Sequence, residues 1–237
     1  MKGRDSHLFD LIAQGEHQQQ DFKYKVEDAA KLARSVSAFA NTDGGRLLIG
    51  VRDDGSIHGV RSEEEIFMMH AAAYKFCTPQ PTLQFETLQV PTAPHGGRLR
   101  TVVICTVMPS AERPVFAIED MAGEVRRSAE KDTARRRTAY VRIADENIVA
   151  SPVHLAIWRQ EAQLRGQAFA DTPAERALLE ALNEASQGVT LNMLCRQVAR
   201  RQPMPRAEVI TAIARFVRFG LARMERHEQQ WLFGAAE

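Results

Sequence analysis

Cysteine is scarce in this sequence of 237 residues, and its three cysteines lie far apart. Cys77, Cys105 and Cys195 are odd in number and include no Cys-x-x-Cys pair, which argues against a disulfide framework and against a zinc site built from thiolates. A reducing compartment fits this pattern best, so we expect a cytoplasmic protein.

Long apolar runs are absent as well. No apolar stretch approaches the length of a membrane span. Near the start of the sequence, Asp5, His7 and Asp10 stand where a signal peptide would need an uninterrupted apolar segment. We therefore expect a soluble protein without a membrane partner.

An excess of either charge is missing too, since the formal net charge is only +1. Any nucleic-acid-binding surface must therefore come from local segregation of lysine and arginine. Apolar residues, in contrast, are plentiful, and a hydrophobic content of 44% is enough to bury a substantial core. The length allows one large domain or one medium and one small domain, and we expect two.

Two common catalytic signatures are also missing. The sequence contains no Gly-x-x-x-x-Gly-Lys-Ser/Thr P-loop, and its histidines do not follow the metal-binding His-Glu-x-x-His spacing. The segment 41–45, Asn-Thr-Asp-Gly-Gly, could present backbone N–H groups to a phosphate and so sense a nucleotide. We favour the simpler interpretation, in which the glycines end a helix and turn the chain into a buried strand.

The N-terminal half carries the pattern of a strand, a helix and a second strand. Apolar and charged residues alternate over 21–26, which puts Asp21, Lys23 and Lys25 on one face of a strand. Helical spacing of apolar residues predicts a helix at 27–41. An almost continuous apolar run predicts a strand at 46–51, and a turn signal follows at 53–55.

The sequence from there to residue 165 predicts a helix, then three strands, and then a second helix. The first of these helices begins at a capping box formed by Ser62 and Glu65. The strands are predicted at 83–90, 99–107 and 139–143, with a polar stretch at 119–137 and a helix from 152 towards 165.

A change of composition marks a second, helical unit. Residues 166–171 resemble a linker, and Thr172-Pro-Ala-Glu175 is a capping box with proline at the first helical position. Three helices followed by a hairpin at 221–225 and 230–233 predict a winged helix. We therefore expect a first domain at 1–165, a linker at 166–171 and a winged-helix domain at 172–237.

Three carboxylates form the sharpest candidate site. If Glu16, Asp21 and Asp53 come together, they can hold a hard divalent cation that polarises a phosphodiester and activates water. The alternative is that Asp53 serves a hairpin turn and Glu16 caps a helix end. Lys23 shares a strand face with Asp21, so it either balances that carboxylate and meets a phosphate or is an ordinary solvated lysine.

The segments Asp21-Phe-Lys-Tyr and 37–55, together with a Tyr-x-Arg strand ending at Arg142, resemble the N-terminal core of the Schlafen family, also called a divergent-AAA or Alba-like domain. The resemblance covers about Glu16 to Arg159 and implies an α/β (α+β) Schlafen-like core followed here by a winged helix. It also implies that Glu16, Asp21 and Asp53 are the centre of a nuclease that cuts transfer RNA and related structured RNA. The sequence departs from the family at Asp21, where glutamate is usual, and at Gln20, where an apolar residue is usual.

Several basic residues are candidates for binding nucleic acid. Lys25 follows Lys23 on the charged face of the first strand, and a basic cluster lies in the polar stretch before the Tyr-x-Arg strand. The cluster either grips a nucleic-acid backbone or is a solvated loop, and Arg142 either contacts phosphate or pairs with an internal carboxylate. The cluster comprises Arg126, Arg127, Lys131, Arg135, Arg136 and Arg137.

In the second unit, Arg206, Thr211, Arg215 and Arg218 are predicted on the exposed side of the third helix, where a winged helix reads the major groove of DNA. The alternative is that this unit only packs or dimerises and its arginines are solvated.

Two functional hypotheses follow from these observations. The first is an endoribonuclease that uses Mg²⁺ or Mn²⁺ at Glu16, Asp21 and Asp53, with Lys23 at the site and the basic residues on the RNA backbone. Family nucleases use two related lobes and this chain contains one, so the first hypothesis implies a homodimer. The second is a non-catalytic DNA-binding regulator that dimerises or senses a nucleotide.

Overall fold

The computed structural model describes residues 2–93, 96–120, 135–163 and 172–236. The chain divides into two compact units, one at 1–149 and the other at 150–237. Each unit has helices and β-sheet, so the predicted mixed α/β class is confirmed.

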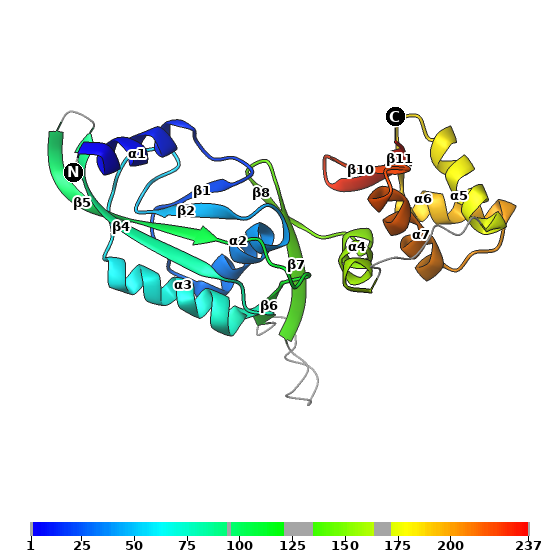
Figure 1. Ribbon diagram of the computed structural model, residues 1–237, viewed down its shortest axis with the longest axis horizontal. Helices are drawn as coiled ribbons and strands as arrows, with labels where there is room; N and C mark the ends of the chain where they lie inside the picture. The colour runs from blue at the N-terminus through cyan, green and yellow to red at the C-terminus, as the bar shows by residue number, and fades with distance from the viewer. Residues whose placement is uncertain (1, 94–95, 121–134, 164–171, 237) are drawn as a thin grey trace. The chain divides into compact units, whose positions relative to one another are not determined.

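The described residues of unit 1 form two four-stranded sheets and three helices; Figure 1 shows their arrangement within the unit. The strand orders are β1-β2-β5-β4 and β3-β6-β7-β8. The helices are α1 (Lys2–Ala13), α2 (Ala29–Asn41) and α3 (Ser62–Phe76). The strands are β1 (Gln20–Lys23), β2 (Gly45–Ile49), β3 (Cys77–Thr78), β4 (Leu83–Ala93), β5 (Gly96–Val107), β6 (Phe116–Asp120), β7 (Arg135–Ile143) and β8 (Glu146–Val149).

The predicted strand, helix and strand are β1, α2 and β2. β1 and β2 pair in parallel, with Asp21 opposite Leu47 and Phe22 opposite Leu48. Because side chains alternate along a strand, Asp21 lies on the face of the sheet that α2 and α3 cover, whereas Phe22 lies on the face that α1 covers. β1 is an edge strand of its sheet, so its residues adjoin the loop between α1 and β1.

Helix α2 connects the two sheets of unit 1 and is buried on most sides. Asp28 caps its N-terminus by accepting from the N–H groups of Ala30 and Lys31. At its other end, the buried Asn41 donates to the carbonyls of Val115 and Tyr140 and accepts from the N–H of Val115. This polar side chain therefore ties the helix to the second sheet.

The segment 41–45 is the helix end that the simpler interpretation predicts. Gly44 has a φ of 72°, and a Cβ at Gly45 would lie 2.3 Å from the ring of Phe39. Positive φ and close packing both require glycine here, so the two glycines are explained by the fold.

Helix α3 begins differently from the prediction. Arg61 is its N-cap residue without a side-chain cap, and the carboxylate of Glu65 accepts instead from the N–H of Val26 at 2.8 Å. The predicted Ser62–Glu65 capping box is therefore wrong, because Glu65 is buried against the 24–28 loop. Burial raises the pKa of Glu65 above its ordinary value.

In the part of unit 2 that the structure describes, there are four helices and a three-stranded sheet of order β10-β11-β9; Figure 1 labels these elements. The capping box of Thr172 and Glu175 is confirmed, with Pro173 at the start of α5. The elements are α4 (Pro152–Gln163), α5 (Pro173–Glu184), β9 (Val189–Thr190), α6 (Leu191–Arg201), α7 (Arg206–Arg218), β10 (Ala222–His227) and β11 (Gln230–Ala235).

Helix α4 belongs to unit 2. Val153 is fully buried in the same core as α5, α6 and α7, and Gln160 donates to the carbonyl of Thr211 in α7 at 2.9 Å. The sequence grouped this helix with the first domain, whereas the compact units divide before it. The predicted linker at 166–171 lies outside the described residues. The α5-β9-α6-α7-β10-β11 part has the helices and hairpin that led us to predict a winged helix, and that assignment stays a prediction.

Candidate functional site

Glu16 and Asp21 lie together at the start of β1. Glu16 follows α1, and its Oε1 accepts from the N–H of Phe22 at 2.8 Å, which folds the carboxylate back onto the edge strand. Burial raises the pKa of Glu16, and a hydrogen bond to Asp21 and the charge of Asp21 raise it further. Two of the three predicted acids are therefore in contact, and Glu16 holds its proton more tightly than an ordinary glutamate.

Two cations neutralise Asp21. Its carboxylate is 6% exposed, with Oδ2 2.6 Å from the ammonium of Lys23 and Oδ1 3.3 Å from the guanidinium of Arg142. Lys23 is about one-third exposed, whereas Arg142 is fully buried. The prediction that Lys23 balances Asp21 is confirmed by this contact.

Arg142 is tied to internal groups on several sides. Its guanidinium donates to Asn147 Oδ1 at 2.9 Å and to the carbonyl of Gln20 at 3.3 Å, and it lies 5.1 Å from the centre of the Phe39 ring. Its side chain is 1% exposed. A guanidinium that does not reach solvent cannot contact a nucleic acid directly. The interpretation of Arg142 as a nucleic-acid contact is therefore corrected, and the alternative, internal pairing with a carboxylate, describes the structure.

Asp53 lies apart from the other two acids. It is exposed in the turn after β2, and the next part of this turn approaches α1, where a Cβ at Gly55 would lie 3.1 Å from Ile12. Asp21 points to the opposite face of the sheet, towards α2. Within the described part of the chain, no three acids, histidines or cysteines lie close enough to hold a metal ion. Asp53 as a third metal ligand stays a prediction.

A basic groove adjoins the Glu16–Asp21 pair. It has a volume of 760 Å³ and is lined by the end of β1 and the loop after it, the first half of α2 and the start of β8. Lys25 is paired with Glu27, and Arg34 with Glu119 at 2.8 Å, whereas Lys31 has no carboxylate partner among the described residues. The charged and polar residues that line the groove are Lys23, Lys25, Glu27, Asp28, Lys31, Arg34, Ser35, Glu146 and Asn147.

The basic cluster before the Tyr-x-Arg strand is only partly described. Arg126, Arg127 and Lys131 lie outside the described residues. Residues 135–137 belong to β7 and pair with β6, so the predicted polar stretch contains strand at both ends. Arg136 and Arg137 are exposed and, as neighbours in a strand, point to opposite faces. Arg135, Arg136 and Arg137 as nucleic-acid contacts stay a prediction.

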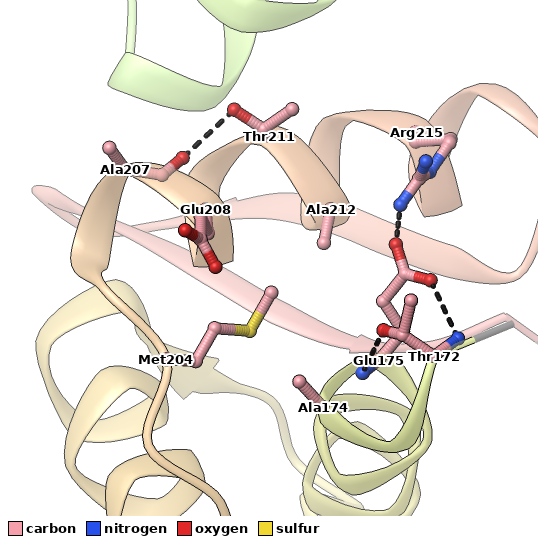
Figure 2. A pocket seen from close by; sticks show the side chains of 9 residues that line it. All are labelled: Thr172, Ala174, Glu175, Met204, Ala207, Glu208, Thr211, Ala212 and Arg215. Carbon is pink, nitrogen blue, oxygen red and sulfur yellow. Dashed lines mark hydrogen bonds and ion pairs between the residues drawn. The ribbon is translucent and has the colours of Figure 1, made fainter. Parts of the chain in front are cut away.

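The predicted reading helix of unit 2 is α7. Figure 2 shows that Arg215 reaches the carboxylate of Glu175 in α5, and that Thr211 donates to the carbonyl of Ala207 in its own helix. Arg215 is about one-quarter exposed and lines a cavity of 320 Å³. The prediction that Arg215 lies on the exposed side of α7 is therefore wrong, because its guanidinium pairs with Glu175 within unit 2.

Arg206 and Arg218 remain exposed at the two ends of α7. Arg206 donates to Asn192 Oδ1 in α6 at 2.7 Å, which fixes its direction without neutralising its charge. These two arginines are the members of the predicted reading set whose charge faces solvent.

Sequence reasoning missed the basic residues of α2. Lys31 and Arg34 are three residues apart on a helix whose buried apolar stripe was predicted. The same periodicity puts them on the opposite, polar face of the helix, and that face was the signal that could have identified them. It also missed Asn147 and Ser35, which bond to each other at 2.9 Å in the lining of the groove.

The fold and site define a mixed α/β domain with a charged site at one strand edge and a basic groove beside it. The family model described as Schlafen, AlbA_2 matches residues 16–151, more than half of the chain. The chain belongs to the Schlafen AlbA_2 family, and membership implies nucleic-acid binding. The predicted family is thereby confirmed.

Comparison with solved structures finds the DIP2311 protein from Corynebacterium diphtheriae, at 20% identity and a TM-score of 0.40. The match covers 79% of this chain and 36% of that chain, so this chain spans about a third of the length of that protein. No curated protein matches. Among the described helices, none is long and apolar enough to span a bilayer.

Proposed function

We propose that the chain is a divalent-metal-dependent endoribonuclease that cuts structured RNA, with transfer RNA as the first substrate to test. The observation that carries the proposal is the position of Lys23, which bonds Asp21 at 2.6 Å and also lines the basic groove. A phosphate held in this groove would lie next to the Glu16–Asp21 pair, where acid–base chemistry is available.

The two carboxyl groups have different surroundings. Asp21 pairs with the cations of Lys23 and Arg142, whereas burial and the neighbouring Asp21 raise the pKa of Glu16. A carboxyl group with a raised pKa is suited to exchange a proton near neutral pH, and an ion-paired neighbour is suited to orient it. We assign Glu16 to exchange a proton with the reacting ribose or water, and Asp21 to orient that proton and the approaching phosphate.

The pair also fits a divalent cation of a particular kind. Mg²⁺ is commonly held by one or two carboxylates together with phosphate oxygens of the substrate, and Mn²⁺ prefers the same hard oxygen ligands. In its ionised form Glu16 would supply one such side chain and Asp21 the second, and Asp53 is not needed for this minimal set. When bound, the cation supplies charge stabilisation at the phosphate and a more acidic water.

The test is incubation of the full chain with bulk transfer RNA and, separately, duplex DNA, in Mg²⁺, in Mn²⁺ and in chelator. We expect cleavage of transfer RNA with either metal and none in chelator. Lys31→Gln should weaken RNA binding and reduce the slope of log affinity against log salt by about 1, since it removes one phosphate contact. Intact RNA in both metals would contradict the proposal.

The matched control is Lys75→Gln. Lys75 is an exposed lysine on α3, outside the residues that line the groove. Its loss should leave both the affinity and the salt dependence close to those of the wild type. Equal effects of the two lysine substitutions would mean that the RNA does not use the groove.

A second function is favoured by the exposed Arg206 and Arg218 on α7. A winged helix that presents these charges would bind duplex DNA without cutting it, as in a transcriptional regulator. Binding that is retained in chelator, prefers some duplex sequences and weakens in Arg218→Ala would support this function. DNA binding that is unchanged in Arg206→Ala and Arg218→Ala would exclude α7 as the reading helix.

A further inference from the structure

An exposed tyrosine surrounded by cations lies beside the basic groove. Tyr24 follows directly after β1, and 38% of its surface is exposed. The guanidinium of Arg52 lies 5.3 Å from the centre of its ring, and the ammonium of Lys25 lies 5.9 Å from it. Both distances are within the range of cation–π contacts.

His58 forms another side of this cluster. Its ring centre is 4.2 Å from that of Tyr24, and its Nδ1 lies 3.4 Å from Arg52 Nη2. Burial lowers the pKa of His58, and the charges of Arg52, Arg100 and Lys25 lower it further. The histidine is therefore neutral near pH 7, and its Nδ1 can accept from Arg52.

The backbone positions the cluster at the ends of two parallel strands. Gly50 follows β2, donates to the carbonyl of Lys23 and accepts from the N–H groups of His58 and Gly59. Gly59 has a φ of 80°, and a Cβ there would lie 2.7 Å from Arg100. The glycine thus lets the Arg100 side chain pass close to the loop that carries His58.

The charges around the ring favour an anionic ligand with an aromatic part. Arg52, Lys25 and Arg100 are cationic, and the acids that act on them are Glu27, which pairs with Lys25, Glu65, which also attracts Lys25, and Asp54. Hydrogen bonds from Ser56, and to a lesser extent the charge of Arg52, lower the pKa of Asp54. With 38% of its surface exposed, Tyr24 is accessible to a ligand. Lys25 also lines the basic groove, so this lysine is shared by the ring and the groove.

We propose that Tyr24 is a stacking site for an unpaired nucleobase, with Lys25 and Arg52 contacting the phosphates on either side of it. Single-stranded segments are recognised by aromatic rings beside a basic track, and every base offers a face to stack. The inference deepens the proposed function, on which it rests, by naming the substrate class: RNA with an unpaired nucleotide next to the Glu16–Asp21 pair.

The test measures binding without cleavage, so that it is independent of the nuclease activity. The full chain is titrated in chelator into a short single-stranded RNA that contains one 2-aminopurine, and into the same RNA in a perfect duplex. We expect stacking to change the 2-aminopurine fluorescence in the single strand. Tyr24→Ala should weaken single-strand binding by about 5-fold to 150-fold, the loss of one base–aromatic stack, and should leave duplex binding unchanged.

Two variants make the result specific. Tyr24→Phe keeps the ring and should bind as the wild type does. Tyr74→Ala removes another exposed tyrosine, 55% exposed on α3, and should have no effect. A single-stranded DNA of the same sequence shows whether the ribose contributes: equal affinity assigns the contact to the base alone, and weaker affinity adds a ribose contact to the stack.

The failure of each proposal has its own signature. Tyr24→Ala binding as tightly as the wild type, or 2-aminopurine fluorescence unchanged on binding, would overturn the stacking site even if the wild type cleaves RNA. Single-strand binding that depends on Tyr24, in a protein that cuts no RNA with either metal, would keep the stacking site and overturn the nuclease.

Discussion

At the scale of single residues, the most informative one is Arg142. A buried guanidinium is costly unless its charge and its donors are matched, and here Asp21 balances the charge while Asn147 and the carbonyl of Gln20 accept from its two terminal nitrogens. The arginine thereby holds Asp21 in place from behind, and leaves its other oxygen for Lys23 at the groove.

Loss of Arg142 tests this internal role. Arg142→Gln leaves the buried Asp21 without its main partner, so we expect the free energy of unfolding to fall by about 3–5 kcal/mol in urea titrations followed by circular dichroism. Arg218→Gln, at an exposed arginine, should change it by less than about 0.5 kcal/mol. Unchanged stability in Arg142→Gln together with weaker RNA binding would instead support the phosphate contact.

The sequence could predict Asp21 and Lys23 as neighbours because strand alternation puts residues two apart on one face. It could not predict the burial of Arg142. That burial depends on β7 lying against α2, and α2 and β7 are distant in the sequence. Nor could it place Asp53, since the direction of a turn depends on what it packs against, here α1.

At the scale of elements, periodicity predicted the helices after α1 and most of the longer strands of both units, whereas α1 was not predicted. β1, α2 and β2 lie where alternation, helical spacing and a continuous apolar run predicted them. β6 was missed because it begins within a segment that contains proline and continues into the polar stretch, where no apolar period is visible. The capping box predicted at α3 was wrong because the Glu65 carboxylate accepts from the backbone N–H of Val26, which is distant in the sequence.

His154, a partly buried residue of α4, connects elements within unit 2. The Nδ1 atom of His154 accepts from the N–H of Ser151, which lies just before the helix, at 3.1 Å. The ring of His154 lies 5.8 Å from that of Trp158 and 4.6 Å from that of Trp231 in β11. Burial lowers the pKa of His154 to about 4.

The stability of unit 2 should therefore depend on pH. The folded pKa lies below the ordinary 6.5, so the stabilisation is fully present above pH 6.5 and is lost as the pH falls towards 4. We expect a loss of about 3 kcal/mol over this range, because one pKa unit corresponds to about 1.4 kcal/mol. Urea unfolding followed by tryptophan fluorescence reports it, since both tryptophans of the chain lie beside His154.

His154→Asn isolates this contribution. The variant should be less stable at pH 7 but should show a smaller change between pH 6.5 and 4. His227→Asn removes an exposed histidine of the same unit and should keep the full pH dependence of the wild type. A pH dependence that persists in His154→Asn would assign it to other groups.

At the scale of the whole molecule, the two units have separate cores and separate candidate surfaces. The first carries the Glu16–Asp21 pair, the groove and Tyr24, and the second carries α7 and the hairpin of β10 and β11. Family membership covers the first unit, so nucleic-acid binding is expected from the first unit whether or not the second reads DNA. A homodimer that supplies a second lobe stays a prediction.

The central claim is that the Glu16–Asp21 pair at the mouth of the groove cuts RNA. The most direct measurement compares single-turnover cleavage of transfer RNA, at saturating protein in Mg²⁺, by the wild type, Asp21→Asn and Asp145→Asn, an exposed acid of the same unit. We predict that Asp21→Asn lowers the cleavage rate by about 100-fold or more, as expected when the carboxylate that orients the proton exchanged by Glu16 is lost, and that Asp145→Asn cleaves at the wild-type rate. Wild-type cleavage by a folded Asp21→Asn protein would contradict the account.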